Sequence, residues 1–480
     1  MATRETKEKL KIGLVCLRAD NFDGGMKKNF EEAKSTLRAY SEQLDYDFFC
    51  YPELILTPDD VSAACSMIKT QNPDFLMIQF TSFPSGEAII RLSKSCKRLG
   101  FWAIPESSYE GSNFVNSNNS FCGMNMACGI ASSYLKGLNI DYKWFFGYPD
   151  DERFRRRFSV TAKALGAIKK MAASRVALIG GIAPGFNDLY YDERLCTARL
   201  GTTIEARHEF SEIYKRAHAY KDSEIEPVAA CYSCKNCGGN VKKEELGISA
   251  RYYKAYTDFA AENKYDALAV SCWPQIKVDA LACSIIGKLN QDCLPASCEG
   301  DIPGAVSMLM LRFITESPVT LMDMCGIDES DETALMWHCG PSPEFFADER
   351  GATTTHSYQL NLAGESIAHS LMHDMVFKPQ PVTFMRVTGE WDKMFLLGGN
   401  VINYPKPSPD GSRGWIGNLK LNGKTVKAID LVNTILTRGF EHHYPMAAGD
   451  ISAICMEVAS WLGLNMLKSV EYEDYRQGVE

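Results

Sequence analysis

Short apolar runs and amphipathic helical segments take turns along the first third of the chain. Runs typical of buried strands lie at residues 11–17, 45–51, 74–80 and 101–104. Helical patterns lie between them, at residues 27–44, 58–70 and 86–99. This alternation predicts a parallel sheet covered by helices on both faces. We therefore expect a first α/β domain over residues 1–150.

The alternation starts again after a long helical segment rich in Arg, Lys and Ala at residues 151–173. Strand patterns at 175–181 and 267–273 follow, with a long helical pattern at 250–262 between them. These elements predict a second α/β domain over residues 151–315, Rossmann-like as the first one, and Glu299 falls within it.

Beyond Cys339 the helical periodicity fades and β-rich runs appear at residues 382–387, 393–399 and 417–421. Turn residues such as Pro409-Asp410-Gly411 separate them. We expect a mainly antiparallel β domain over residues 316–480, a barrel or sandwich that ends with a helix at 450–462 and carries Asp323 and His443. The predicted fold class is α/β: two successive α/β (Rossmann-like) domains followed by a mainly antiparallel β domain.

The composition is that of a globular protein, with 45% hydrophobic and 23% charged residues among 480. A formal net charge of -9 argues against a nucleic-acid partner or an anionic membrane surface. No window approaches the ~18 consecutive apolar residues of a membrane span. The first ten residues are charged and lack the apolar stretch of a signal peptide, so we expect a cytoplasmic protein.

Two carboxylates and three histidines are the candidate site residues. Glu299 precedes a helical segment at 306–313, and Asp323 ends a strand-like run at 318–322. Ligands of α/β folds bind beyond the carboxyl ends of strands, so both side chains could converge there. Together with His338, His442 and His443 they are the ligand types of Mn²⁺ and related ions. Spacing alone leaves open a capping Glu, a surface Asp and chance histidines.

Two segments resemble a known family. Ala296-Ser297-Cys298-Glu299-Gly300-Asp301, a Gly-Ala helix opening and a strand ending in Asp323 follow the pattern of the L-fucose isomerases and, more distantly, the L-arabinose isomerases. Gly439-Phe440-Glu441-His442-His443, followed by Gly449-Asp450, matches the segment that carries the family's metal histidine. The resemblance implies that Glu299, Asp323 and His443 bind a divalent metal, with Mn²⁺ the expected ion.

The resemblance also suggests substrate contacts. His442 stands where fucose isomerases carry Asn, which implies that it faces the substrate. His338 falls near a metal-ligand histidine of the arabinose isomerases, so it could bind metal, contact substrate or belong to the core. Gln275 aligns loosely with a family segment near the sugar, although a loop-capping role is the alternative. Trp391 is an apolar candidate to stack on the sugar, with core packing as its alternative.

The implied activity is metal-dependent aldose–ketose isomerisation through an enediolate. Glu299 and Asp323 would move the proton between C1 and C2 as acid and base. The substrate would be fucose-like, arabinose-like or an anionic hexose such as sulfoquinovose. Family members form homo-oligomers, here a trimer or hexamer, with sites at subunit interfaces. The alternative is a non-catalytic sugar-binding protein on the same scaffold, which would not need the carboxylates and the histidine pair.

Two other motifs suggest different chemistry. Cys231-x-x-Cys234-x-x-Cys237 has a spacing that could hold zinc or an iron–sulfur cluster, although no fourth ligand is evident nearby. Reduced thiols in an exposed loop are the default interpretation. Gly180-Gly181-Ile182-Ala183-Pro184-Gly185 follows a strand but lacks the GxGxxG spacing, so a tight turn is favoured over a phosphate loop.

Overall fold

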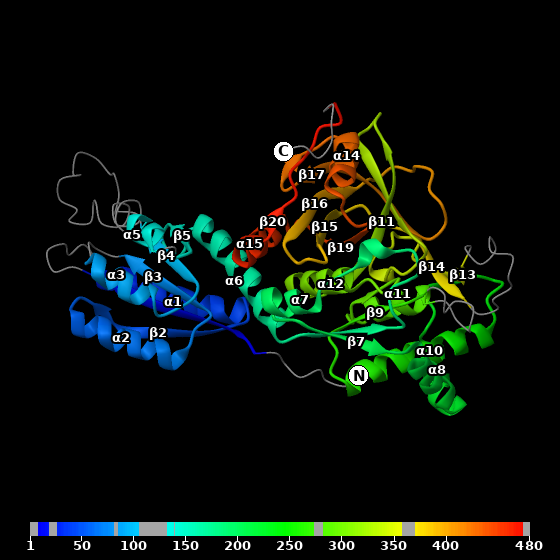
Figure 1. The fold of residues 1–480 in the computed structure, drawn as a ribbon, viewed down its shortest axis with the longest axis horizontal. Coiled ribbons are helices and arrows are strands. Elements are labelled where there is room, and N and C mark those ends of the chain that lie inside the picture. Colours follow the sequence, from blue (N-terminus) through cyan, green and yellow to red (C-terminus); the bar gives the residue numbers. More distant parts are fainter. Residues whose placement is uncertain are drawn as a thin grey trace. The chain divides into compact units, whose positions relative to one another are not determined.

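The computed structural model describes residues 8–18, 26–80, 85–104, 132–138, 140–272, 282–357 and 370–473. The chain divides into two compact units (Figure 1): one spans Glu8–Lys169 and the other begins at Lys170 and extends to Glu480. The predicted boundary near residue 150 falls at the start of helix α6 (Glu152–Ala172). The predicted boundary at 315 coincides with the end of helix α12 (Ile302–Thr315), inside the second unit.

The unit Glu8–Lys169 is built on a parallel sheet in the order β2-β1-β3-β4-β5. Its strands are β1 (Leu10–Leu17), β2 (Tyr46–Ile55), β3 (Phe75–Phe80), β4 (Leu99–Ala103) and β5 (Tyr142–Phe146). Helices α2 (Pro58–Gln71), α3 (Gly86–Ser93) and α5 (Ser132–Gly137) pack on one face. Aromatic side chains link α1 (Met26–Gln43) and α6 to the other face. Two covered faces explain why β3 is buried throughout.

The second unit contains a smaller parallel sheet in the order β10-β9-β6-β7. Its strands are β6 (Arg175–Ile179), β7 (Thr203–His208), β9 (Ala267–Val270) and β10 (Ala296–Ser297). The helices of this part are α7 (Glu193–Leu200), α8 (Phe210–Ala219), α9 (Asp222–Ala230), α10 (Lys243–Glu262), α11 (Cys283–Gln291) and α12. Helix α12 is buried along most of its length because it packs on β9 and on barrel strands β19, β15 and β11.

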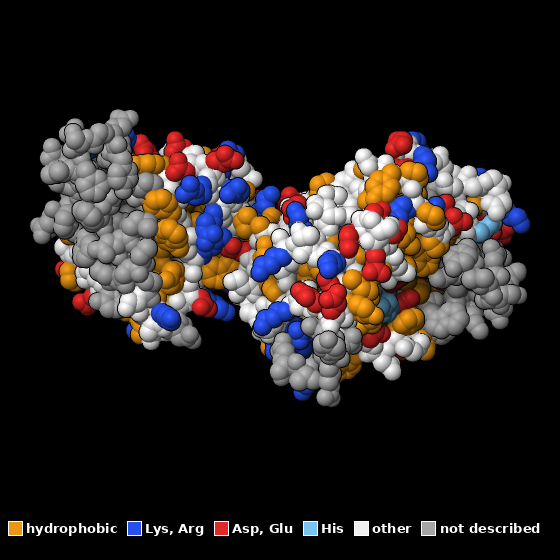
Figure 2. All heavy atoms as spheres, turned by 90° about the horizontal axis from the view of Figure 1, so that it is seen from above, with side chains coloured by type: hydrophobic (Ala, Val, Ile, Leu, Met, Phe, Trp, Pro, Cys, Tyr) orange, Lys and Arg blue, Asp and Glu red, His pale blue; other side chains and the backbone are white. Residues whose placement is uncertain are grey.

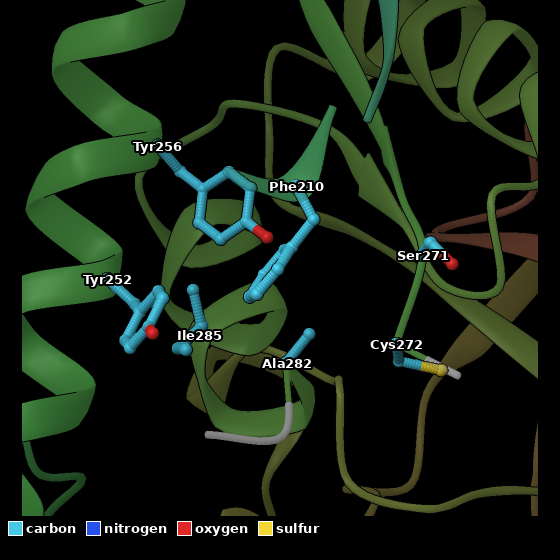
Figure 3. Close-up of a pocket in the computed structure, with 7 residues that line it drawn as sticks. All are labelled: Phe210, Tyr252, Tyr256, Ser271, Cys272, Ala282 and Ile285. Carbon is cyan, nitrogen blue, oxygen red and sulfur yellow. The ribbon is translucent and has the colours of Figure 1, made fainter. Parts of the chain in front are cut away.

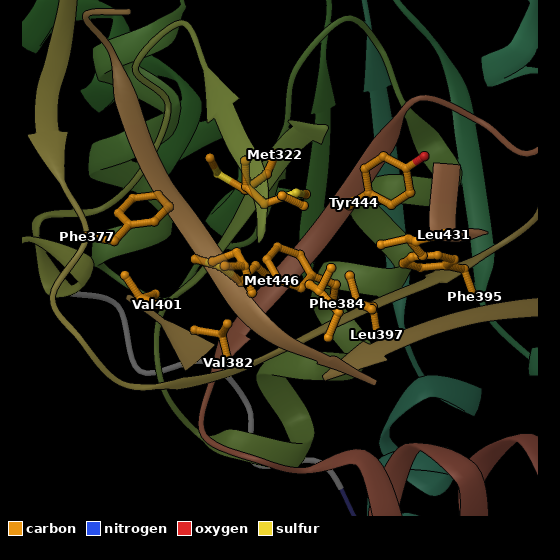
Figure 4. Close-up of a cluster of buried hydrophobic side chains, with 14 of the residues drawn as sticks. Met322, Phe377, Val382, Phe384, Phe395, Leu397, Val401, Leu431, Tyr444 and Met446 are labelled. Atoms are coloured by element: carbon orange, nitrogen blue, oxygen red, sulfur yellow. The ribbon is translucent and has the colours of Figure 1, made fainter. Parts of the chain in front are cut away.

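The rest of this unit is a closed antiparallel barrel in which β16 pairs with β17 to complete the ring β16-β15-β19-β11-β12-β17. Its strands are β11 (Val319–Asp328), β12 (Thr333–His338), β15 (Pro381–Val387), β16 (Lys393–Val401), β17 (Ser412–Leu421) and β19 (His443–Ala448). Their inward side chains form an apolar core that includes Met322, Phe384, Phe395 and Met446 (Figure 4).

Short strands and two helices surround the barrel. Strands β13 (Thr353–His356), β14 (Leu371–Val376), β18 (Lys424–Thr425) and β20 (Asn465–Met466) extend the sheet, and β8 (Asn236–Cys237) pairs with β13. Helices α14 (Ala428–Arg438) and α15 (Ser452–Leu462) flank β19 in the sequence. On the face drawn in Figure 2, Lys and Arg side chains are interspersed with Asp and Glu. In the described residues, no helix has the length and apolar character needed to cross a membrane.

One strand is longer than the sequence predicted, and the difference matters for the site. The strand predicted to end before Asp323 continues as β11 to Asp328. Asp323 therefore lies inside a barrel strand, paired with Trp337 on one side and His443 on the other. Its position is set by the barrel's pairing register, not by the carboxyl end of a parallel strand.

Candidate functional site

Glu299 occupies a strained turn between β10 and α12. Its φ of 61° and the φ of 72° at Gly300 are both left-handed, which is costly for a residue with a side chain and is common at functional sites. A Cβ on Gly300 would lie 2.2 Å from the carbonyl oxygen of Gly181. The amide of Ala183 donates to the Glu299 carbonyl at 2.9 Å. The glycine-rich segment after β6 thus holds the Glu299 turn in place, a packing role in line with the turn interpretation.

Asp323 and His443 face each other across neighbouring strands. They are direct partners in the antiparallel pairing of β11 with β19. His443 Nε2 lies 3.6 Å from Asp323 Oδ1 and 3.5 Å from Glu299 Oε2. The structure therefore brings together the three residues that the sequence analysis assigned to metal binding, with one imidazole nitrogen between two carboxylates.

Several buried atoms of this cluster lack a hydrogen bond. Among the described residues, Asp323 Oδ1, His443 Nε2 and His338 Nε2 are buried side-chain atoms without a hydrogen-bond partner. Buried polar atoms are normally paired, so such a group requires an explanation. Potential ligand atoms within 4.8 Å of one another form two triads that share His443: Glu299 with His442, and Asp323 with His338. Carboxylate oxygens and imidazole nitrogens in this arrangement fit a hard or borderline divalent cation.

A buried charge network holds His443. Asp301 Oδ2 lies 3.0 Å from His443 Nδ1, and Arg386 binds both carboxylate oxygens of Asp301, at 2.6 and 3.0 Å. Burial alone would raise the pKa of Asp301, but Arg386 and His443 hold it below the usual range. Since the Asp301 carboxylate can only accept, the Nδ1–H of His443 must donate to it. In the neutral ring, the lone pair of Nε2 is then directed at Glu299 and Asp323.

His442 bridges two acidic residues at the edge of the site. Its Nδ1 lies 2.5 Å from Asp188 Oδ2, and its Nε2 lies 3.3 Å from Glu299 Oε2. Burial alone would lower the pKa of His442, but these two carboxylates raise it to about 9. The His442 side chain is 34% exposed, so it remains accessible to a ligand. Asp188 has no signal in the sequence that would mark it, because its partner is 254 residues away.

His338 ends β12 and stacks on His443 with ring centroids 5.4 Å apart. Its Nδ1 accepts a hydrogen bond from the amide of Cys339 at 2.8 Å. In the neutral ring the proton is then on Nε2, which makes this nitrogen a donor. This nitrogen can therefore donate to a substrate oxygen or, without its proton, join Asp323 and His443 around a metal ion, and both roles were left open by the sequence.

The other candidates lie elsewhere. Trp391 is fully buried, and its indole Nε1 donates to the carbonyl of Asp192 at 2.8 Å, which is the packing arrangement given as its alternative. Gln275 lies outside the described residues.

The three cysteines of the Cys-x-x-Cys-x-x-Cys motif differ in exposure: Cys231 and Cys237 are exposed and Cys234 is partly buried. Within the described ranges, these three thiols do not form one of the groups that could hold a metal.

Relatives with an assigned activity cover most of the chain. Sulfoquinovose isomerase from Priestia aryabhattai is 24% identical over 433 residues, which cover 86% of this chain and 90% of the relative. The enzyme of that name from Alkalicoccus urumqiensis is 23% identical, and the match covers 87% of this chain and 90% of the relative. The one from Clostridium sp. (strain MSTE9) is also 23% identical, and the match covers 95% of this chain and 97% of the relative. No family model matches the chain. These relatives indicate that the protein is an enzyme, an isomerase.

Solved structures add nothing to this assignment. A periplasmic solute-binding protein from Actinobacillus succinogenes 130z with bound D-allose is 12% identical, and the match covers 64% of this chain and 93% of that one. Its TM-score of 0.18 is too low to indicate a shared fold.

Proposed function

We propose that the protein is a metal-dependent aldose–ketose isomerase that interconverts a 6-sulfonated hexose, sulfoquinovose, and its 2-ketose. The observation that carries the proposal is the position of His443 Nε2, a buried atom without a hydrogen bond, 3.5 Å from Glu299 Oε2 and 3.6 Å from Asp323 Oδ1. The relatives named sulfoquinovose isomerase support the substrate, because they match this chain over most of its length. They favour the anionic hexose over the fucose-like and arabinose-like substrates that the sequence also left open.

Glu299, Asp323 and His443 would hold the divalent ion, for which we propose Mn²⁺. Two carboxylates and one imidazole form a donor set that suits this ion. When bound, the ion supplies positive charge that stabilises negative charge developing on the sugar oxygens.

The protein's own residues would carry the proton transfer. Burial opposes ionisation of Glu299, but His442 and the neighbouring histidines lower its pKa, so it is present as a carboxylate at neutral pH. A carboxylate can take the proton from one sugar carbon and return it to the next, and Asp323 is the second candidate for this role. The donor Nε2–H of His338 would orient a sugar oxygen. His442, as a cation between Asp188 and Glu299, would keep Glu299 directed into the site.

The decisive experiment follows deuterium exchange at C2 of the sugar by NMR in D₂O. Protein stripped with EDTA is tested with and without Mn²⁺ on sulfoquinovose, fucose and arabinose. We expect Mn²⁺-dependent exchange that is fastest with sulfoquinovose and is lost in Glu299→Gln and Asp323→Asn. Asp328→Asn is the matched control, because Asp328 is also a carboxylate of β11 but pairs with Lys406, so this variant should keep wild-type exchange.

Two results would overturn the proposal. Exchange that is independent of metal would remove the proposed role of Glu299, Asp323 and His443 as ligands. Absence of exchange on every sugar, in a folded protein that binds Mn²⁺, would favour the alternative of a sugar-binding protein on this scaffold. Light scattering of the same sample would test the expected homo-oligomer.

A further inference from the structure

Four buried thiols lie beside the candidate site. Cys272 Sγ and Cys298 Sγ are 3.2 Å apart, and Cys283 Sγ and Cys339 Sγ are 3.3 Å apart. Cys298 directly precedes Glu299, and Cys339 directly follows His338. The exposed fraction of each of these four residues is 8% or less. Such a concentration of sulfur is not needed for isomerisation.

A carboxylate lies close to one of the two thiol pairs. The sulfur atoms of Cys272 and Cys298 and a carboxylate oxygen of Glu299 all lie within 4.8 Å of one another. Two thiolates bound to one tetrahedral zinc, at Zn–S distances of about 2.3 Å, are about 3.8 Å apart. The two sulfurs would therefore need to separate by only about 0.6 Å from their 3.2 Å contact.

The surroundings of Cys272 favour sulfur as the donor on this side. Cys272 lines a small pocket whose other walls include the aromatic side chains of Phe210, Tyr252 and Tyr256 (Figure 3). None of the residues that line this pocket is an imidazole or a carboxylate. The oxygen and nitrogen donors Asp323 and His443 belong instead to the barrel strands.

We propose that Cys272, Cys298 and Glu299 form a second metal site, selective for thiophilic divalent ions such as Zn²⁺, Cd²⁺ and Co²⁺. Binding replaces two S–H bonds by two metal–sulfur bonds and releases two protons to solvent. Because Glu299 also belongs to the proposed Mn²⁺ site, an ion on the thiols draws this carboxylate away from Asp323 and His443. Soft and hard ions thus compete for one carboxylate, and ligand softness decides which site is filled.

The test uses Co²⁺, because thiolate ligation gives it an intense near-ultraviolet charge-transfer absorption that oxygen and nitrogen ligands do not produce. The full chain is stripped of metal, reduced and kept anaerobic. Cys231, Cys234 and Cys237 are all replaced by Ser in the background protein, so that these loop thiols cannot contribute. We expect the absorption to saturate at one Co²⁺ per chain and to disappear when Zn²⁺ is added.

Matched variants locate the sulfur ligands. Cys298→Ser and Cys272→Ser should each abolish most of the absorption, whereas Cys283→Ser should retain it. Circular dichroism checks the fold, and Cys272→Ala and Cys298→Ala replace any Ser variant that does not fold. The inference is overturned if the absorption persists in the folded Cys298 and Cys272 variants. It is also overturned if Co²⁺ binds without the absorption. Sugar turnover is not part of the readout, so failure of the proposed function would not affect this result.

Discussion

Asp301 and Arg386 form an ion pair from which solvent is excluded, and the same Asp301 oxygen that binds Arg386 Nη1 at 2.6 Å accepts from His443 Nδ1 at 3.0 Å. Both side chains of the pair have an exposed fraction of 0%. Burial of two charges costs several kcal/mol per ion, and their attraction often does no more than offset that cost. The pair therefore contributes most by fixing the orientation and tautomer of His443.

The first prediction concerns this pair. Asp301→Asn keeps the shape of the side chain but removes the charge that orients His443, so we expect Mn²⁺ affinity to fall by about 10–100-fold. Arg386 would also lose the charge of Asp301 and keep Glu441, whose Oε2 lies 3.6 Å from Arg386 Nε, so the free energy of unfolding should fall toward the lower end of about 3–5 kcal/mol. Calorimetric Mn²⁺ titration and denaturant unfolding measure the two effects. Asp328→Asn is the control, and wild-type Mn²⁺ affinity in folded Asp301→Asn would contradict the positioning role.

The second prediction separates the two adjacent histidines. His443→Asn removes a proposed ligand and should reduce Mn²⁺ affinity by more than about 100-fold, beyond the loss typical of a supporting residue. His442→Asn keeps all three proposed ligands and removes only a contact that directs Glu299 into the site, so its Mn²⁺ affinity should stay within about tenfold of wild type. Calorimetry on both folded variants measures the difference. Equal losses in the two variants would show that His442 is itself a ligand.

The third prediction concerns the turn that carries Glu299. Gly300→Ala introduces both an unfavourable positive φ and a Cβ 2.2 Å from the Gly181 carbonyl oxygen. Gly181→Ala is a close control, because its φ is 83° but nothing lies within 4 Å of the added Cβ. We expect Gly181→Ala to lower the free energy of unfolding by about 1–2 kcal/mol, from backbone strain alone. Gly300→Ala should lower it by clearly more, because the added Cβ also clashes. Denaturant unfolding at equal pH measures both, and equal costs would contradict the close packing of these two turns.

Strands buried on both faces were the elements most accurately predicted from the sequence. The apolar runs at 11–17 and 74–80 correspond to β1 and β3, because a continuous hydrophobic run is typical of a strand covered by helices on both sides. Helix α14 was not predicted, since its 11 residues stand in a region dominated by β-rich runs. The extension of β11 past Asp323 was also missed, because pairing with β12 and β19 keeps these residues extended whatever their polarity.

The residues that contact the site residues could not be predicted from the sequence. Glu299, Asp323 and His443 were proposed from motifs, and the structure places them close together. Asp188 contacts His442 across 254 positions, and Arg386 contacts Asp301 across 85. No local periodicity encodes such contacts, because Asp188 follows β6 and Asp301 precedes α12, and both meet residues of the barrel part of the chain. The metal and substrate roles of these residues stay predictions.

The last prediction concerns acid stability and His373 of β14. This side chain is buried, its Nδ1–H donates to the Ser342 carbonyl at 3.0 Å, and burial lowers its pKa to about 4. The unfolded chain has an ordinary histidine pKa of about 6.5. Between these two pH values the unfolded chain binds a proton at His373 and the folded chain does not. The contribution of His373 to the free energy of unfolding is therefore fully present above a pH of about 6.5 and is lost as the pH drops toward 4.

The matching variant is His373→Asn, whose amide can still donate to Ser342. The free energy of unfolding of wild type minus that of the variant should fall by up to about 3 kcal/mol between neutral pH and a pH of about 4. A shift of one pKa unit corresponds to about 1.4 kcal/mol. Denaturant unfolding of both proteins across this pH range measures the difference, and contributions from carboxylates common to both cancel. A difference between wild type and His373→Asn that stays constant across this pH range would show that His373 accepts its proton as readily in the folded chain as in the unfolded one.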